Sequence, residues 1–453
     1  MNQNSSSAPG AGGQVPRRRN IPRQRSPLRF AAPILAAVLV FAALALAVSL
    51  LLRDRPASPV PAVTTGRETS SRPETLAPDT EKETLPPETE IPETEPPLLD
   101  QSPVSFVAAG DNLVYRPNIW EAEERAQAEG KSEMDFFFTY ENVRDTIAGA
   151  DLAFINQETL LCGRNYEWAG YPLFNGPFEM GKTLSAIGFD VINIATNHML
   201  DQGSATGEGI RITREFWETQ PVTLIGAYLN EADFNTPRIV EKNGIRIAFL
   251  AYTEHTNGLR LTSGEVVVPY FDKDTIRRQV AAAKEQADLV FVSAHWGNES
   301  TPVLTDFQEE YAQFMAELGV DVILGTHSHC WQPIRWISGA DGHRTLCAFS
   351  LSNFIAIMHL PINALGGFLS FDIVPDRKGN YAIENVTVIP TVSHFNYGFR
   401  QNTLYYLKDY TDELAAASGI GISFGNPVRL TDLYAYLSST IDAAFLPDFV
   451  KNR

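Results

Sequence analysis

Two histidines separated by one residue, His327 and His329, follow an apolar run within residues 320–332 (VDVILGTHSHCWQ). The run is short enough for a buried strand, and side chains two residues apart on an extended backbone point to the same side. We therefore expect both imidazoles to converge on one point beyond the strand. Converging neutral imidazoles are the beginning of a Zn, Mn or Fe site, although a pair of surface histidines gives the same pattern.

Four other predicted strands also end in polar residues: GDN at 110–112, NQET at 156–159, TNHMLDQG at 196–203 and HWGNE at 295–299. Ligands of α/β folds bind beyond the carboxyl ends of the strands. Carboxylate, amide and imidazole donors suit one or two Mn, Zn or Fe ions, and a two-ion centre would be hydrolytic with Glu158 as its bridging carboxylate. His198 is predicted to donate a proton to the leaving group. The predicted metal ligands are Asp111, Glu158, Asn197, His295, His327 and His329.

Each of these residues also has a purely structural explanation. Asp111 would serve as a turn residue or helix N-cap, and Asn197 suits a turn. Glu158 would be a surface charge and His295 a packed core residue. Together, five polar strand ends favour the metal site over five independent coincidences. Four other histidines do not follow comparable strands and are predicted to be structural, with His255 the first exception to consider; they are His255, His343, His359 and His394.

The composition changes sharply along the 453 residues. Residues 1–29, rich in Arg, Gly and Ser, are predicted to be a disordered cytoplasmic tail. Residues 30–52 are almost wholly apolar and long enough to cross a bilayer, and the basic flank before them keeps the N-terminus inside the cell. A cleaved signal peptide is the alternative, given Ala45 and Ala47, but the length favours an anchor. Residues 53–100, rich in Pro, Thr and Glu, are predicted to be an extended extracellular linker before a domain at 101–453.

Charge and cysteine content exclude several classes of protein. The formal net charge is -18, and the basic residues of the tail leave the rest of the chain acidic, which argues against nucleic acid as a partner. The three cysteines, Cys162, Cys330 and Cys347, have no CxxC spacing. They form neither a disulfide framework nor a cysteine-based zinc site, and both one disulfide and three free thiols remain open.

Predicted strands and helices alternate from residue 104 onward. A hairpin is predicted at 238–252, with its turn at Asn243-Gly244, and Asp272 is predicted to cap a helix. The alternation, with several hairpins, predicts an α/β domain built around mixed β-sheet. The other strands are expected at 104–110, 151–156, 189–195, 289–294, 320–324, 345–351, 368–373 and 382–389, and helices at 132–148, 178–187, 205–219, 272–286 and 306–318.

These segments resemble the CapA family of capsule-synthesis proteins, also called poly-γ-glutamate synthesis accessory proteins. The resemblance runs from about residue 104 to 388 and rests on NQET at 156–159, GFDVINIATNHMLDQG at 188–203, HWGNE at 295–299, GVDVILGTHSHCWQPI at 319–334 and FSLSNFI at 349–355. The family is similar in fold to calcineurin-like metallophosphoesterases. The resemblance therefore implies a sandwich of two mixed β-sheets flanked by helices.

The resemblance also implies roles for individual residues. Asp111 would stand at the first metal-binding aspartate, and Glu158 would replace the bridging aspartate. Asn197-His198 matches the Asn-His of the phosphoesterases, His295 their isolated histidine, and His327 and His329 their HxH. One departure is that Asp111 is followed by Asn112 and Leu113, so the histidine ligand of an Asp-x-His is absent. This implies that one of two metals would have fewer ligands.

The function implied is that of a membrane-anchored, extracellular protein in the synthesis or export of poly-γ-glutamate or a related anionic capsule polymer. Its metal-dependent centre would hydrolyse a phosphoester or an amide. Two alternatives are a non-catalytic accessory subunit that partners a membrane polymer synthase through residues 30–52, and a secreted metal-dependent phosphoesterase. An acidic domain that faces an anionic polymer needs a bound cation or a local basic groove.

Overall fold

The computed structural model describes residues 102–376 and 378–453. The cytoplasmic tail predicted at 1–29, the membrane anchor at 30–52 and the linker at 53–100 all lie outside the described residues. Within the described part, every helix is too short or too polar to cross a membrane.

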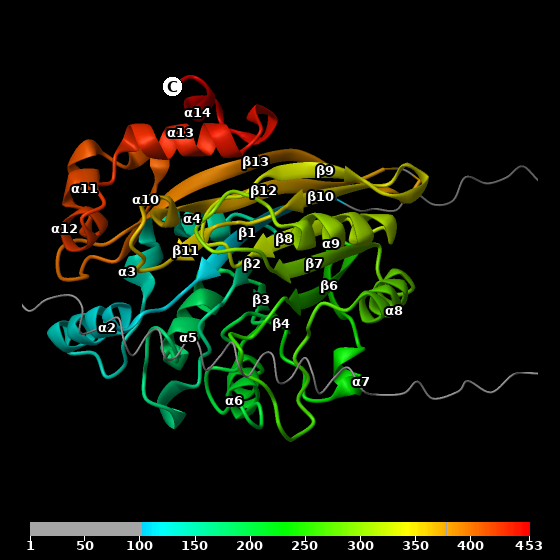
Figure 1. Ribbon diagram of the computed structural model, residues 1–453, viewed down its shortest axis with the longest axis horizontal. Helices are drawn as coiled ribbons and strands as arrows, with labels where there is room; N and C mark the ends of the chain where they lie inside the picture. The colour runs from blue at the N-terminus through cyan, green and yellow to red at the C-terminus, as the bar shows by residue number, and fades with distance from the viewer. Residues whose placement is uncertain (1–101, 377) are drawn as a thin grey trace, which may run out of the picture. The chain divides into compact units, whose positions relative to one another are not determined.

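The described strands form two mixed β-sheets (Figure 1). In the eight-stranded sheet, β1 to β4 run parallel, β12 pairs antiparallel with β1, and the short β11 pairs with the end of β1. Its order is β14 (Thr403–Tyr406), β13 (Tyr381–His394), β12 (Leu365–Pro375), β1 (Val104–Asn112), β2 (Leu152–Asn156), β3 (Val191–Asn193) and β4 (Thr223–Ile225), with β11 (Asn353–Ile355) beside β1.

The six-stranded sheet has a parallel centre and two antiparallel edges. Its order is β5 (Arg238–Lys242), β6 (Ile245–Thr253), β7 (Leu289–His295), β8 (Val322–Thr326), β10 (Arg344–Ala348) and β9 (Ile334–Ser338). The parallel strands β6, β7 and β8 therefore end at one edge of this sheet, as β1, β2 and β3 do in the other.

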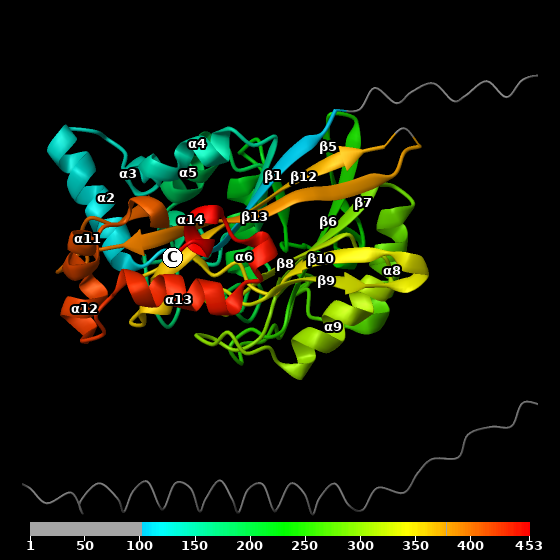
Figure 2. The same cartoon turned by 90° about the horizontal axis from the view of Figure 1, so that it is seen from above.

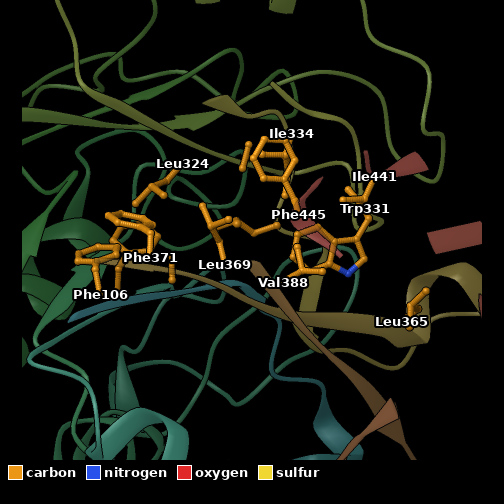
Figure 3. Close-up of a cluster of buried hydrophobic side chains, with 14 of the residues drawn as sticks. Phe106, Leu324, Trp331, Ile334, Leu365, Leu369, Phe371, Val388, Ile441 and Phe445 are labelled. Carbon is orange, nitrogen blue, oxygen red and sulfur yellow. The ribbon is translucent and has the colours of Figure 1, made fainter. Parts of the chain in front are cut away.

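The two sheets pack face to face around an apolar core. Along β1, Phe106 belongs to the core between the sheets, whereas Val107 belongs to the core on the outer face. Side chains of a strand alternate between its two faces, so a strand covered on both sides is apolar throughout. Between the sheets, the ring of Phe106 lies 4.9 Å from that of Phe371 and 5.4 Å from that of Phe291, centroid to centroid. Figure 3 shows Phe106 and Phe371 with Leu324 in this core.

Helices cover the outer faces of both sheets. The eight-stranded sheet is covered by α2 (Arg116–Glu129), α5 (Phe178–Ile187) and α6 (Glu208–Trp217), and the six-stranded sheet by α8 (Lys273–Lys284) and α9 (Asp306–Glu317). The C-terminal helices α13 (Leu430–Thr440) and α14 (Asp448–Lys451) lie against β13 in both views (Figures 1 and 2). The fold is thus the α/β domain that the alternation of elements predicted, in the form of the sandwich of two mixed sheets flanked by helices that the family resemblance implied.

Shorter helical segments complete the described chain. They are α3 (Phe137–Tyr140), η2 (Glu141–Val143), α4 (Arg144–Ala148), η3 (Gly163–Asn165), α7 (Glu231–Phe234), η4 (Ala340–Gly342), α10 (Pro361–Ala364), η5 (Leu407–Asp409), α11 (Asp412–Ala417), α12 (Gly419–Phe424) and η6 (Ala443–Phe445).

Local sequence signals placed several elements correctly. The hairpin of β5 and β6 turns at Asn243 and Gly244, both with positive φ (51° and 74°), as a two-residue turn of this kind requires. The side chain of Asp272 accepts a hydrogen bond from the Thr275 N–H at 2.8 Å, which confirms it as the cap of α8. Helix α5 has the predicted bounds. The thiols of the three cysteines are free and buried, so of the two alternatives, one disulfide or three free thiols, the structure has three free thiols.

The single helix predicted at 132–148 is wrong. The structure has three short turns instead, α3, η2 and α4, and residues 132–136 are not helical. The apolar spacing of three residues at Phe137, Tyr140 and Val143 suits a 3₁₀ turn as well as one face of an α-helix. Tyr140 is also held by a tertiary contact, since its hydroxyl donates to Asn112 Oδ1 at 2.6 Å. The strand predicted at 189–195 is likewise shorter, and only 191–193 pair as β3.

Candidate metal centre

The carboxyl ends of strands from both sheets meet at one buried cluster. The eight-stranded sheet contributes oxygen donors, namely Asp111 on β1, Glu158 after β2 and Asn197 after β3. The six-stranded sheet contributes the imidazoles of His295 at the end of β7 and of His327 and His329 after β8. The structure therefore brings together all six residues predicted as metal ligands.

Two glycines allow these strand ends to approach their neighbours. A Cβ at Gly110 would lie 1.9 Å from the Ser352 carbonyl oxygen, and a Cβ at Gly325 would lie 2.0 Å from that of Phe349. No side chain fits at either position. Gly110 and Gly325 thus let β1 and β8 run directly against residues 349–352, just before each strand delivers its polar residues.

The His327–His329 pair converges by a different route from the one predicted. Strand β8 ends at Thr326, and both histidines have positive φ, 88° for His327 and 55° for His329. Their backbone is a left-handed turn, not the extended chain on which the expectation rested. Their rings nevertheless lie 6.0 Å apart, centroid to centroid. Non-glycine residues held in this region are characteristic of functional sites, because surrounding contacts must stabilise the strained backbone.

Glu158 is the least satisfied residue of the cluster. Its side chain is completely buried, and neither carboxylate oxygen has a hydrogen-bond partner in the described structure. Three imidazole nitrogens surround Oε1, the Nε2 atoms of His329 at 3.7 Å, His295 at 3.8 Å and His198 at 3.9 Å. Burial raises the pKa of Glu158 well above its usual value. A buried carboxylate without partners is costly unless a cation or proton neutralises it, so this position fits a metal ion.

Asp111 lies beside His329 and is firmly held. Its carboxylate accepts hydrogen bonds from Asn156 Nδ2 at 2.7 Å and from the His327 backbone N–H at 3.2 Å, and lies 2.9 Å from His329 Nδ1. Burial lowers the pKa of His329, but the carboxylates of Glu158 and Asp111 outweigh it and raise the pKa to about 10. These carboxylates stabilise positive charge, and a divalent cation would compete with that proton.

The other two imidazoles are poised as neutral ligands. Burial, reinforced by the neighbouring histidines, lowers the pKa of His295 and of His327 well below 6.5. His295 Nε2 lies 2.9 Å from Asn197 Oδ1, and His327 Nδ1 is buried with no partner in the part of the chain that the structure describes. Asn197 Nδ2 donates to Asn257 Oδ1 at 3.3 Å, which turns the Asn197 oxygen toward His295. Neutral imidazole is the form that binds metals.

Donor atoms in the described part of the chain form three groups that could each hold a metal ion, with the atoms of a group within 4.8 Å of one another. Glu158 belongs to two of them, as a bridging carboxylate would. The mixture of imidazole, carboxylate and amide oxygen suits Mn, Zn or Fe. The groups are Glu158, His295 and His327; Asp111, Glu158 and His329; and Glu299, His327 and His329.

His198 is oriented by a buried carboxylate. Its Nδ1 lies 2.7 Å from Asp201 Oδ2, which also accepts the Phe174 backbone N–H at 2.7 Å. The ring of Phe174 packs edge-to-face on the imidazole at 4.7 Å. With Nδ1 directed at Asp201, Nε2 is the nitrogen that faces Glu158. Asp201, which lies in the same TNHMLDQG motif as His198, thus sets the orientation of the imidazole.

Residues 105–358 match the family model described as bacterial capsule synthesis protein PGA_cap. The chain belongs to this family. It is 30% identical over 188 residues to the PGA biosynthesis protein CapA of Bacillus subtilis, which covers 39% of this chain and 45% of that protein. It is also 30% identical over 183 residues to the capsule biosynthesis protein CapA of Bacillus anthracis, covering 39% and 42%. Each match thus spans less than half of the relative.

Solved structures show only partial similarity to this PGA_cap family member. A phosphatase from Mycoplasma pneumoniae gives a TM-score of 0.40 at 13% identity and covers 64% of this chain and 94% of that one. The NAD nucleotidase of Haemophilus influenzae gives 0.38 at 12% identity and covers 78% and 59%. At these values neither similarity supports a functional conclusion.

Two further residues at the cluster were not among the predicted ligands. Glu299, the last residue of HWGNE, belongs to one of the three donor groups, and its place in that motif was the signal. His255, the first exception considered among the remaining histidines, packs edge-to-face on His327 with centroids 5.0 Å apart. The other three do not join the cluster: His343 contacts the Val320 carbonyl oxygen, His359 is exposed, and His394 contacts Tyr410.

An open groove of about 1030 Å³ borders the centre, and Glu254 and His255 are among the residues that line it. Apolar side chains such as Leu261 form part of its wall, together with Arg260 and Glu265. A groove with apolar walls and a few charged groups that reaches the cluster is suited to holding the organic part of a substrate.

Proposed function

We propose that this PGA_cap family member acts in the synthesis or export of poly-γ-glutamate or a related anionic capsule polymer, through a metal-dependent hydrolase-type centre. One observation carries the proposal of a metal. Among the described residues the buried Glu158 carboxylate has no hydrogen-bond partner, and it faces three imidazole nitrogens at 3.7–3.9 Å. Family membership supports the capsule role.

The residues divide into those that hold the cation and those that handle the proton. Glu158, Asp111, Asn197 and the three imidazoles of His295, His327 and His329 would hold one or two divalent ions. A bound cation would supply Lewis-acid polarisation of a phosphoryl or, less favourably, an amide carbonyl oxygen.

His198 would hold the proton that the leaving group takes up. Asp201 fixes Nδ1 at 2.7 Å, so Nε2 is the atom that exchanges a proton toward the reaction site. Phe174 shields the imidazole on one side and shares the Asp201 carboxylate through its backbone N–H. This keeps His198 in one orientation, as a general acid requires.

Membrane attachment and extracellular location are part of the proposal. They rest on the apolar residues 30–52 and the basic residues before them. A membrane polymer synthase would be the partner on this side, and the anionic polymer or a phosphoester the substrate. Phosphoesters or polymer carboxylates would approach an acidic domain with the bound cation offsetting their repulsion.

Metal analysis of the purified full chain, before and after chelation, tests the centre directly. We expect Mn, Zn or Fe at about one or two ions per chain, and phosphoester hydrolysis that returns when metal is restored. The double variant His327→Ala, His329→Ala should lose both. Unchanged metal content and activity in that variant would show that the centre is misassigned.

A non-catalytic accessory subunit is the second candidate, and the first strand favours it. Asp111 is followed by Asn112 and Leu113, which have no imidazole, so the histidine ligand of an Asp-x-His is absent. Asn112 instead binds Gln157 and Tyr140, and Leu113 packs in an apolar cluster. Replacing residues 30–52 by an unrelated transmembrane helix separates the two. Loss of polymer with intact metal binding would support the partner role, whereas retained polymer would oppose it.

A further inference from the structure

The HWGNE turn holds Glu299 beside the histidines after β8. The Gly297 N–H donates to Glu254 Oε2 at 2.8 Å, and the Ser300 N–H donates to the Ser328 carbonyl oxygen at 2.7 Å. Both residues have positive φ, 91° and 58°. Two hydrogen bonds that flank Glu299 therefore fix its backbone next to His327 and His329.

The first strand leaves one cation position short of a ligand. Asp111, Glu158 and His329 have donor atoms within 4.8 Å of one another. The residues after Asp111 turn elsewhere: Asn112 Nδ2 donates to Gln157 Oε1 at 2.7 Å, and Leu113 packs with Phe174 and other apolar residues. No nitrogen ligand reaches this position from β1.

Glu299 is placed to supply the missing ligand. Its carboxylate lies in one donor group with His327 and His329, and His329 is shared with the group of Asp111 and Glu158. The Glu158 carboxylate, which this position shares, is completely buried and has no hydrogen-bond partner among the described residues, which independently indicates a cation here. Glu299 itself is exposed, and the described residues give it no hydrogen bond or ion pair.

We propose that Glu299 binds a second cation and replaces the imidazole that the first strand lacks. The proposal rests on the metal centre proposed above and adds a second position to it. That position combines the carboxylates of Asp111, Glu158 and Glu299 with His329, whereas the first combines Glu158 and Asn197 with His295 and His327. An oxygen-rich set favours Mn²⁺ over Zn²⁺ at the second position. Because Glu299 lies at the exposed rim, it closes the position from the solvent side.

Titration of the full chain with Mn²⁺ after chelation tests this, with free Mn²⁺ followed by its electron paramagnetic resonance signal. We expect two Mn²⁺ per chain. Glu299→Gln should keep one and weaken the other by at least about tenfold, as expected for loss of a ligand-sphere group. Glu265→Gln is the matched control, because it removes the same charge from the wall of the bordering groove, outside the three donor groups, and should bind Mn²⁺ as the unaltered chain does.

The outcomes separate this inference from the function on which it rests. Absence of Mn²⁺ and Zn²⁺ binding in the unaltered chain would overturn both. The role of Glu299 alone would be overturned if the unaltered chain bound one tight ion and Glu299→Gln bound it equally well. It would also be overturned if the unaltered chain and Glu299→Gln each bound two ions with equal affinity. Equal weakening in Glu265→Gln would show a general charge effect and would also overturn it. Thermal melting of the variants, which should match, verifies that they are folded.

Discussion

The two sheets present different donors at the edge where they meet. The eight-stranded sheet brings Asp111, Glu158 and Asn197, all of them oxygen ligands, whereas the six-stranded sheet brings the imidazoles of His295, His327 and His329. Burial acts on the two sides in opposite ways: it raises the pKa of Glu158 and lowers those of His295 and His327. Both shifts favour neutral groups.

Neither sheet would form this centre alone. The oxygen side has a carboxylate without partners, and the nitrogen side has an imidazole nitrogen without one. Facing each other across the sandwich, they form a set of donors that a divalent cation satisfies on both sides at once. The assembly thus depends on the apolar core between the sheets, which brings the two edges together.

Removing the oxygen side should have the largest effect. Glu158→Gln is expected to weaken Mn²⁺ and Zn²⁺ binding by more than about 100-fold, because Glu158 belongs to two donor groups. Calorimetric titration with each ion measures the effect. Tight binding in this variant would contradict the central role of Glu158.

Removing one imidazole from the nitrogen side should have a smaller and more selective effect. His295→Ala is expected to weaken Zn²⁺ binding by about 10- to 100-fold and Mn²⁺ binding less, since imidazole suits zinc. Competition between the two ions in one titration measures the ratio. His343→Ala is the control, because His343 lies outside the cluster and contacts the Val320 carbonyl oxygen. Equal losses for both ions would oppose a division of chemistry between the sheets.

A change in the pair of His198 and Asp201 should affect the rate of phosphoester hydrolysis more than the metal content. In Asp201→Asn, His198 loses the charged acceptor of its Nδ1–H, and phosphoester hydrolysis is expected to fall by about 10- to 100-fold. Metal per chain should stay the same, since Asp201 belongs to none of the three donor groups. A parallel loss of metal would instead assign Asp201 a role in holding the oxygen side.

A buried histidine outside the centre should leave metal binding unchanged and affect only stability. Burial lowers the pKa of His394 on β13 to about 4, and its Nδ1 lies 2.8 Å from the Tyr410 hydroxyl. Between pH 6.5 and 4 the unfolded chain binds a proton there that the native protein does not. Stability from this group is therefore present above pH 6.5 and is lost as the pH falls to 4, by up to about 3 kcal/mol.

His394→Gln removes this titration. The difference in unfolding free energy between the unaltered chain and the variant should shrink as the pH falls from 7 to 4, with both measured in urea and chelator. The histidines of the centre titrate in both proteins and cancel in the difference. A free-energy difference that stays constant with pH would show that His394 is not held neutral in the folded protein. A change in metal binding by His394→Gln would show that His394 is linked to the metal centre.

Several elements follow from interactions between residues that are close together in the chain. The Asn243-Gly244 turn and the Asp272 cap are local interactions, and the strands that carry the site residues are apolar because sheets covered on both faces require it. The sequence also shows which carboxylate, amide and imidazole side chains follow the strands. This pattern predicted Asp111, Glu158 and Asn197 as well as the three histidines, and the fold brings these six together.

How the donors meet depends on contacts between parts of the chain that are far apart in sequence. The turn at His327 and His329 is left-handed because contacts such as that of the His327 N–H with Asp111 hold it, and no local signal contains them. The Asn112 side chain is oriented by its hydrogen bonds with Gln157 and Tyr140. The position of Glu299 depends on the hydrogen bond between the Ser300 N–H and the Ser328 carbonyl oxygen. These partners are far apart in the chain. Burying the apolar faces of the two sheets fixes their edges against each other, and this packing determines which polar groups become neighbours.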